Sequence, residues 1–250
     1  MSDWKREYFE RGYAQRWGLA PPSDHVRLEA AGLLDLLHLS PNSKVADIGC
    51  GHGRHALALA PHGLEVTGVD SAVALLMRAQ HLSAELGVSA RWVRGDMRQL
   101  PLQSECFDAA ILLDAFGFFE TEQENETVLQ EAARVLVRGG RLGLKVVNGG
   151  PVLNAFRETD REEREGTLVT ISRKLSSAPP RMIERISVSG SRGSGQYERR
   201  QRLYQVEEVP AALVRAGLSV IGVFASPNGT AFEPTTSATM WVIGQARGPV

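Results

Sequence analysis

The sequence predicts an α/β protein with a doubly wound, mostly parallel, seven-stranded sheet, into which an antiparallel β-meander is inserted. From residue 44 to residue 148, short apolar runs alternate with helical patterns, which is typical of parallel strands joined by crossover helices. This alternation stops between residues 149 and 204 and then resumes. The interrupting segment has turn signals but no helical pattern between its apolar runs, which favours antiparallel strands.

Composition and charge limit the possible classes of protein. The chain has 250 residues, 43% of them hydrophobic, which suits one large domain with an insertion. Its 28 Lys and Arg nearly balance its 29 Asp and Glu, so it has no overall basic field to hold a nucleic-acid backbone. Two cysteines, a polar N-terminal stretch and the lack of an apolar run of about 20 residues predict a cytoplasmic protein without a membrane partner.

Residues 1–43 are expected to form a helical segment before the sheet. Leucines recur near helical spacing between residues 28 and 39, with Asp24 placed to cap this helix and Pro41 just past its end. An aromatic series precedes it: Trp4, Tyr8, Phe9, Tyr13 and Trp17. Such a series favours a helix face packed on the core, and the alternative is a flap that closes over a pocket.

The core is expected to comprise residues 44–148 and 205–250. Its strands are expected at 44–48, 64–69, 91–94, 107–113, 141–147, 219–224 and 239–245. Its helices are expected up to about residue 60 and at 71–86, 122–137 and 206–216, with Gly139-Gly140 ending the third. The run 107–113 is apolar throughout, as expected for a strand buried on both faces.

Residues 149–204 are expected to form the antiparallel insertion. Its strands are predicted at 168–175, 182–188 and 197–204, separated by Pro179-Pro180 and by the Gly190–Gly195 stretch. Between residues 157 and 202 this segment carries 11 basic and 7 acidic residues. A solvated sheet face accounts for such charge, and the alternative is that some arginines point inward and bind a carboxylate or phosphate.

The glycine-rich loop after the first strand carries the clearest chemical signal. Gly49, Gly51 and Gly53 separate a strand from a helix, so a ligand can approach the backbone and its unpaired N–H groups. The spacing is G-x-G-x-G, not the G-x-G-x-x-G of dinucleotide folds, and Asp47 stands two residues before the first glycine. This carboxylate would repel a pyrophosphate and attract an ammonium or sulfonium group. A nicotinamide oxidoreductase is therefore disfavoured.

Two further acids end the next two strands. Asp70 is placed to accept hydrogen bonds from ribose hydroxyls, and Asp96, with the N–H of Met97 beside it, is placed to meet adenine. Together with the glycine loop and Gly139-Gly140, these residues resemble the class I S-adenosylmethionine-dependent methyltransferases, over roughly residues 44–148 and 206–246. The resemblance implies a Rossmann-like fold and S-adenosyl-L-methionine as cofactor, with S-adenosyl-L-homocysteine as product. It implies cofactor contacts from Tyr8, Tyr13, Asp47, Gly49, Cys50, Gly51, Arg54, Asp70, Ser71, Asp96, Met97 and Leu113.

A finer resemblance is to a bacterial subgroup of small-molecule-type methyltransferases with an antiparallel lid. It rests on the segments 53–57, 66–70, 95–98, 116–120, 147–148 and 202–204. His52, Phe118 and Arg138 depart from the subgroup pattern, and none of these changes removes a cofactor ligand. The resemblance implies methyl transfer to a small-molecule acceptor, mainly by alignment and desolvation. The acceptor pocket is then expected to be formed by Phe116, Phe118, Phe119, Asn148, Arg202 and Tyr204.

Two alternatives to this predicted function remain. An RNA or DNA methyltransferase is disfavoured, because Leu113-Asp114-Ala115-Phe116 is not the Asn/Asp-Pro-Pro-aromatic element and no separate basic module is present. A cofactor-binding module without catalysis is the second alternative. No metal is expected, since His52 and His55 lack a third ligand in the sequence.

No catalytic residue is assigned from the sequence. Cys50 is expected only to pack within the glycine loop, and Cys106 lies before the fourth strand, away from its functional end. Asp114 is either a general base or a partly solvated turn residue.

One hypothesis concerns the charge of the acceptor. Successive side chains of a strand alternate between faces, so Arg200, Arg202 and Tyr204 share one face, which is expected to point toward the pocket. An unpaired arginine there would be costly to bury. Arg202 is therefore expected to hold a carboxylate or phosphate of the acceptor.

Overall fold

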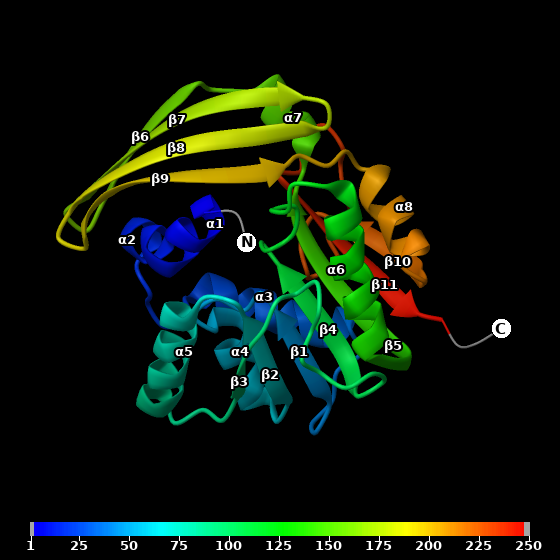
Figure 1. Ribbon diagram of the computed structural model, residues 1–250. Coiled ribbons are helices and arrows are strands. Elements are labelled where there is room, and N and C mark those ends of the chain that lie inside the picture. The colour runs from blue at the N-terminus through cyan, green and yellow to red at the C-terminus, as the bar shows by residue number, and fades with distance from the viewer. Residues whose placement is uncertain (1–2, 248–250) are drawn as a thin grey trace.

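The computed structural model describes residues 3–247, so the outer ends of the predicted segments 1–43 and 205–250 lie outside the described residues. It contains a larger sheet flanked by helices and a smaller, curved sheet above it (Figure 1). The larger sheet has seven strands in the order β10-β11-β5-β4-β1-β2-β3, and the smaller has four in the order β6-β7-β8-β9. The predicted fold class is thereby confirmed.

The seven-stranded sheet places a topological switch point at its centre. Its strands are β1 (Lys44–Ile48), β2 (Glu65–Asp70), β3 (Arg91–Arg94), β4 (Phe107–Leu113), β5 (Leu136–Val147), β10 (Leu218–Phe224) and β11 (Thr239–Ala246). The first five pair in parallel, whereas β11 runs antiparallel to both β5 and β10. Because β1 lies between β2 and β4, the winding direction reverses there, and a crevice is expected at the carboxyl ends of these strands.

Helices cover both faces of this sheet. On one face, α3 (Asp24–Leu36) and α4 (Arg54–Leu59) share a buried apolar cluster with Val45 and Ile111. On the other, α6 (Glu122–Val135) and α8 (Glu208–Arg215) pack against Ala46 and Leu112. Alternate residues of β4 thus enter both clusters, which confirms that this strand is buried on both faces. The remaining core helices are α5 (Val73–Leu86) and the 3₁₀ turn η2 (Ala60–His62).

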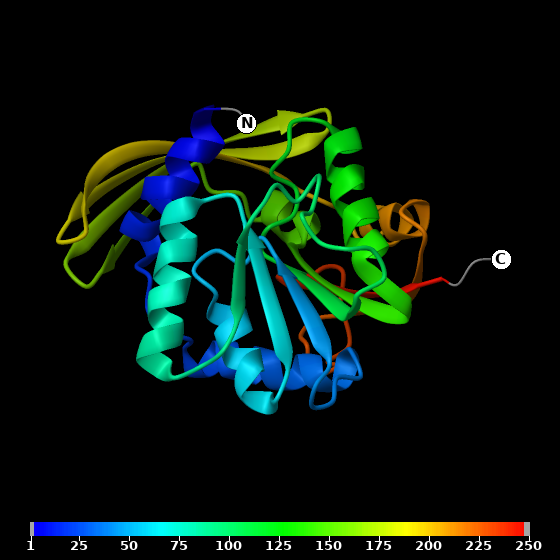
Figure 2. The same ribbon diagram turned by 60° about the horizontal axis from the view of Figure 1, so that its bottom comes forward.

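The N-terminal segment is helical but interrupted. It comprises α1 (Asp3–Glu7), a π-helical turn η1 (Tyr8–Gly12) and α2 (Tyr13–Trp17), which we call the flap (residues 3–17). The flap lies next to α5 (Figure 2) and beneath the smaller sheet (Figure 1). After a non-helical stretch, α3 begins with Ser23 as its N-cap, whose Oγ accepts a hydrogen bond from Val26 N at 3.3 Å. The predicted cap at Asp24 was wrong by one residue.

The insertion forms a separate antiparallel sheet, which we call the lid (residues 149–204). It contains α7 (Gly149–Asn154), β6 (Thr159–Arg164), β7 (Thr167–Ser177), β8 (Pro180–Gly190) and β9 (Gly193–Arg202). Three of its strands were predicted. The fourth, β6, was missed because its sequence Thr-Asp-Arg-Glu-Glu-Arg contains no apolar residue to reveal a period of two.

Two predicted boundaries differ from the structure. The helix α6 ends at Val135, before Gly139-Gly140, because Leu136 already pairs with Phe107 at the start of β5. The strand β9 ends at Arg202, and Tyr204 instead forms an isolated bridge with Asn148 beside the core. Within residues 3–247, no helix is both long and apolar enough to cross a lipid bilayer.

Candidate functional site

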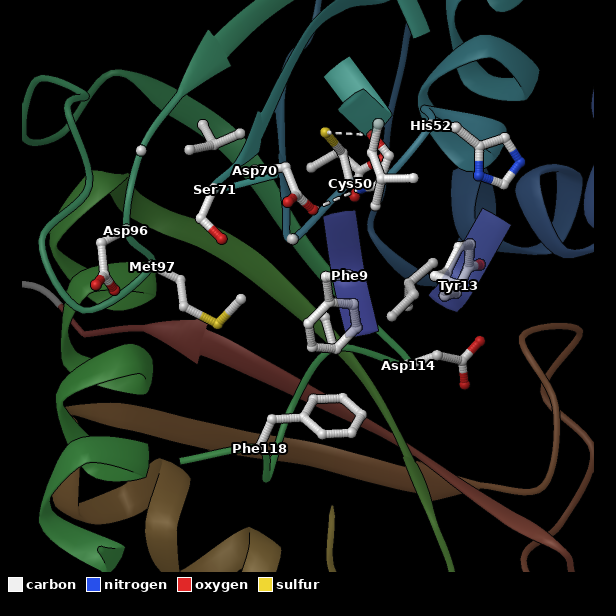
Figure 3. Close-up of a pocket in the computed structure, with 18 of the residues that line it drawn as sticks. Phe9, Tyr13, Cys50, His52, Asp70, Ser71, Asp96, Met97, Asp114 and Phe118 are labelled. Atoms are coloured by element: carbon white, nitrogen blue, oxygen red, sulfur yellow. Dashed lines mark hydrogen bonds between the residues drawn. The ribbon is translucent and has the colours of Figure 1, made fainter. Parts of the chain in front are cut away.

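A pocket of about 1020 Å³ lies at the carboxyl ends of β1, β2 and β4, beneath the flap (Figure 3). The glycine loop, the end of β2 and the segments Gly95–Met97 and Leu113–Ala115 form its floor and sides. Phe9 and Tyr13 of the flap cover it. This volume includes space that is open to solvent, so the pocket is accessible to a ligand from outside.

The glycine loop needs backbone conformations that favour glycine. Gly49, Gly51 and Gly53 have φ values of 72°, 56° and 80°. At Gly49, a Cβ atom would lie 2.6 Å from the Cβ of Ala115, so the loop packs too closely for any side chain there. The loop is fixed to β2, because Gly49 N and Cys50 N both donate to the carbonyl oxygen of Val69, at 2.8 and 3.1 Å.

Asp47 presents a buried carboxylate to this pocket. Its side chain is 3% exposed, and burial raises the pKa of Asp47 to about 7. Among the described residues, its Oδ2 atom has no hydrogen-bond partner. A buried carboxylate oxygen without a partner is costly, and a cationic ligand would stabilise it. The Asp47 carboxylate therefore fits a cofactor that carries ammonium and sulfonium groups.

Asp70 links the glycine loop to the start of α5. Its Oδ2 accepts a hydrogen bond from Gly51 N at 2.8 Å, and its Oδ1 accepts one from Ala72 N at 2.9 Å. Burial raises the pKa of Asp70, and these backbone hydrogen bonds oppose that rise. The carboxylate lies at the pocket between Ser71 and Cys50 (Figure 3), so its remaining acceptor positions are available to a ligand.

Asp96 lies on the other side of the pocket, where an arginine holds it. Arg98 Nη2 lies 2.6 Å from Asp96 Oδ2, and Arg98 N donates to Asp96 Oδ1 at 2.9 Å. This contact with Arg98 lowers the pKa of Asp96. Met97 extends from beside Asp96 toward the pocket (Figure 3). Sequence reasoning did not predict that Arg98 neutralises this carboxylate, although it stands only two positions away.

A network of charges borders the pocket beside Tyr13. Asp114 Oδ2 lies 2.7 Å from Arg54 Nη2 and 3.2 Å from Lys145 Nζ. Lys145 also contacts Glu29 at 2.8 Å, and Glu29 contacts His55 at 2.9 Å. Burial would raise the pKa of Glu29, but His55 and Lys145 together lower it to about 2. Asp114 therefore lines the pocket as the outermost member of a buried ionic network.

The histidines near the loop are not arranged as metal ligands. Burial lowers the pKa of His52 to about 4, so its imidazole is neutral at neutral pH, and its ring lies 6.1 Å from that of Tyr13. His55 is committed to Glu29. In the part of the chain that the structure describes, no group of three His, Cys, Asp or Glu side chains is placed to hold a metal ion.

Most of the predicted cofactor residues come together in this pocket. Those that line it are Tyr13, Asp47, Gly49, Cys50, Gly51, Arg54, Asp70, Ser71, Asp96, Met97 and Leu113. Tyr8 does not; it is 2% exposed and packs with Val169 and Ile171 of the lid. Its neighbour Phe9 faces the pocket instead, and sequence reasoning missed both this residue and Lys5 as lining residues.

The predicted acceptor residues separate into two groups. Phe118 and Phe119 line the pocket, and the Phe9 and Phe118 rings meet edge to face at 5.5 Å. Phe116 and Tyr204 lie outside it and stack on each other at 5.1 Å. Asn148 is also outside the pocket lining, and its amide is used within the fold.

The amide group of Asn148 holds neighbouring backbone in place. Its Nδ2 donates to the carbonyl oxygens of Pro234 and Ser237, both at 2.9 Å, and its Oδ1 accepts from Gly150 N at 3.2 Å. These contacts give Asn148 a structural role.

The structure contradicts the expectation for Arg202. Its side chain is buried, pairs with Glu122 at 3.2 Å and with Glu208, and lies outside the pocket lining. The alternation along β9 was predicted correctly, but the opposite face points inward. Arg199, not Arg202, reaches the pocket wall, where its guanidinium lies 5.1 Å from the Phe118 ring and pairs with Glu184 at 2.7 Å.

The sheet order, the glycine loop and the acids at the ends of β1 and β2 are the arrangement expected of a class I S-adenosylmethionine-dependent methyltransferase, and the chain carries a methyltransferase domain. Residues 45–140 match the family model described as a methyltransferase domain. The predicted methyltransferase class is thereby confirmed, and solved structures that share the fold are S-adenosylmethionine-dependent methyltransferases, in agreement with the predicted cofactor.

Two curated relatives illustrate the range of this class. A probable tRNA methyltransferase 9B from Bos taurus is 31% identical over 157 residues, which are 62% of this chain and 30% of that protein. A 27-O-demethylrifamycin SV methyltransferase from Amycolatopsis mediterranei is 30% identical over 146 residues, which are 56% of this chain and 53% of that protein. The chain thus spans between about a third and about half of these relatives.

Two solved structures share nearly the whole fold. The CcbJ methyltransferase from Streptomyces caelestis has a TM-score of 0.82 at 19% identity, over 98% of this chain and 99% of that one. CalS10 from Micromonospora echinaspora, an amino pentose methyltransferase solved with S-adenosylmethionine bound, has a TM-score of 0.65 at 23% identity, over 94% and 95%. These likenesses extend through the lid as well as the core.

Proposed function

We propose that the protein transfers the methyl group of S-adenosylmethionine to a small-molecule acceptor. The observation that carries the proposal is the aromatic cover of the pocket. Phe9 and Tyr13 of the flap and Phe118 and Phe119 after β4 surround the space above the glycine loop (Figure 3). An aromatic cover of this kind suits a small acceptor better than a nucleic-acid strand.

The residues around the glycine loop have the chemistry to hold the cofactor. Asp47 would attract its cationic groups, the glycine loop would receive its amino-acid part, and Asp70 and Asp96 would meet its ribose and adenine. When bound, the cofactor supplies a methyl group already activated on a sulfonium. The chain then has to align the acceptor and exclude water, and the aromatic cover is suited to both tasks.

The relatives support a small-molecule acceptor without fixing its identity. The names of two of them refer to 27-O-demethylrifamycin SV and an amino pentose, whereas a third refers to tRNA. The aromatic cover of the pocket, rather than the charge of its lining, supports a small molecule over tRNA at this site.

The decisive experiment measures the release of S-adenosylhomocysteine with two pools of acceptors. One pool is a metabolite extract filtered to remove macromolecules, and the other is total tRNA. The proposal expects turnover with the filtered extract. Turnover with tRNA alone, or a failure of S-adenosylhomocysteine to bind in calorimetry, would overturn it.

The glycine loop offers a matched pair of control variants. Gly49→Ala should abolish turnover, because its Cβ would meet Ala115. Gly87→Ala places the same methyl group at a similar φ of 64°, with nothing within 4 Å, and lies away from the pocket lining. Because both variants carry similar backbone strain, only Gly49→Ala should lose activity.

A further inference from the structure

We propose that Lys5 forms an anion-binding subsite in the acceptor part of the pocket, which takes a carboxylate or phosphate oxygen of the acceptor. The inference rests on the proposed function and deepens it by naming a chemical class of acceptor. It also moves the expected anion contact from Arg202, which the structure pairs with Glu122 and Glu208, to a residue of the flap.

The position of Lys5 is unusual for a lysine. It lies on α1, is 6% exposed and lines the same pocket as the glycine loop. Its Nζ lies 4.1 Å from the centre of the Phe119 ring and 5.8 Å from that of Trp4. Apart from these ring contacts, Nζ has neither a hydrogen-bond acceptor nor an ion-pair partner among the side chains that the structure describes. An ammonium has three donors, and because Nζ is not among the fully buried atoms that lack a partner, these donors are open to a ligand in the pocket.

The acids nearest to Lys5 are already bound to other groups. Glu120 accepts from Trp4 Nε1 at 3.1 Å, and Glu124 and Asp96 each lie 2.6 Å from a guanidinium nitrogen of Arg98. Burial lowers the pKa of Lys5, while Glu124 and Glu120 oppose this effect. These acids therefore favour the charged ammonium from a distance, and its donors stay available for a ligand.

The surroundings of Lys5 favour an anion on the acceptor. Phe119 belongs to the aromatic cover of the pocket, and Arg98 lies over the same ring at 4.6 Å. Two cations thus converge on one ring. The other permanent cation of the lining, Arg54, is paired with Asp114 at 2.7 Å. A carboxylate or phosphate beside Phe119 would supply the acceptors that Lys5 lacks, and such charge-assisted contacts are the stronger hydrogen bonds.

Small aromatic anions test this subsite before the acceptor is known. Benzoate, phenyl phosphate and the neutral benzamide are titrated by calorimetry, with and without saturating S-adenosylhomocysteine. Wild-type protein should bind at least one anion about tenfold more tightly than benzamide, which is the scale of one charge-assisted hydrogen bond. The preferred anion shows whether a carboxylate or a phosphate is recognised.

Variants of Lys5 connect that preference to its ammonium. Lys5→Met keeps the apolar stem over Phe119 and should abolish the preference, whereas Lys5→Arg should restore part of it. Lys174→Met removes a charge from an exposed position of the lid and should behave as wild type. Melting temperatures verify that each variant is folded.

The possible failures can be told apart. A preference for the anions that persists in Lys5→Met would overturn the subsite. A loss of S-adenosylhomocysteine affinity in Lys5→Met as large as the loss of anion affinity would also overturn it, by assigning Lys5 to the cofactor. If S-adenosylhomocysteine does not bind wild-type protein, the proposed function fails, and the titrations without it still decide the role of Lys5.

Discussion

The carboxylates of the pocket differ in how many hydrogen-bond and ion-pair partners they have. Asp70 is bound by the backbone N–H groups of Gly51 and Ala72, and Asp96 is bound by Arg98. Asp47 retains an oxygen without a partner among the described residues. Asp70 and Asp96 therefore hold the protein in shape, whereas Asp47 has most to gain from a cationic ligand.

Asp70→Asn tests the part of Asp70 in shaping the glycine loop. An amide cannot accept both backbone hydrogen bonds, so affinity for S-adenosylhomocysteine should fall by about 1–3 kcal/mol, as measured by calorimetry. Asp108→Asn is the matched control, because Asp108 accepts from Lys44 N at 2.8 Å where β1 and β4 begin, at the opposite edge of the sheet. Equal affinities in Asp70→Asn and wild type would disprove the role.

Asp47→Asn tests the buried carboxylate through its pH dependence. The folded pKa of about 7 exceeds the unfolded value of about 4, so the folded protein binds an extra proton between these values. The free energy of unfolding of wild type should therefore decrease as pH rises from about 4 to about 7. Urea denaturation without ligand should show that Asp47→Asn lacks this decrease. Parallel pH profiles for the two proteins would contradict the assignment.

At the scale of elements, the flap is joined to two other elements. Glu10 accepts hydrogen bonds from Val73 N and Ala74 N, both at 3.1 Å, and so caps α5, which has no side-chain cap of its own. Gln15 Oε1 accepts from Tyr197 Oη of the lid at 2.6 Å. The flap is thus held between α5 and the lid, and it brings Phe9 and Tyr13 to the pocket.

Glu10→Ala should loosen the flap. Loss of the cap should destabilise the protein by about 1 kcal/mol and increase hydrogen exchange over residues 3–17. It should also speed the dissociation of S-adenosylhomocysteine, measured by stopped-flow displacement. Glu7→Ala removes an exposed carboxylate from the same flap and should change neither quantity. Similar exchange in the two variants would show that the cap does not hold the flap.

Sequence reasoning predicted the elements better than the faces they present. Periodicity located the core strands and three lid strands, because apolar side chains record burial. It showed that Arg200 and Arg202 share a face, but alternation alone does not say which face meets the pocket. Likewise, the aromatic series suggested either a packed helix or a flap, and the pattern alone does not say which of its rings pack on the core and which line the pocket. Tyr8 packs on the lid, whereas the adjacent Phe9 lines the pocket.

At the scale of the whole molecule, two arginines connect the lid to the core. Arg181 donates to the carbonyl oxygens of Phe119 and Glu120, both at 2.7 Å, and Arg202 pairs with Glu122 of α6. Both contacts involve residues 119–122, which include or directly follow Phe118 and Phe119 of the aromatic cover. No sequence pattern revealed these long-range contacts, because they depend on how the two sheets are oriented.

Arg202→Leu separates this structural role from ligand binding. The variant removes one partner from each of two acids, although Glu122 keeps Arg181 at 3.7 Å and Glu208 keeps the N–H of Gln205 at 2.7 Å. Since Glu122 and Glu208 are also each more than a third exposed, the loss should be only about 1–3 kcal/mol of unfolding free energy. Affinity for S-adenosylhomocysteine should be unchanged. Arg200→Leu, on the same face but 39% exposed, should be close to wild type in both. Weaker ligand binding with unchanged stability would reverse the conclusion.

The contacts of the flap have a consequence for the order in which the protein assembles. Gln15 contacts Arg192 and Tyr197, which are 177 and 182 positions later in the chain. During synthesis the flap therefore leaves the ribosome long before its partners exist, and its aromatic side chains have no surface of the lid to pack on. The residues that are made first take their places only after the lid has folded, so the newly made chain acquires a closed pocket late.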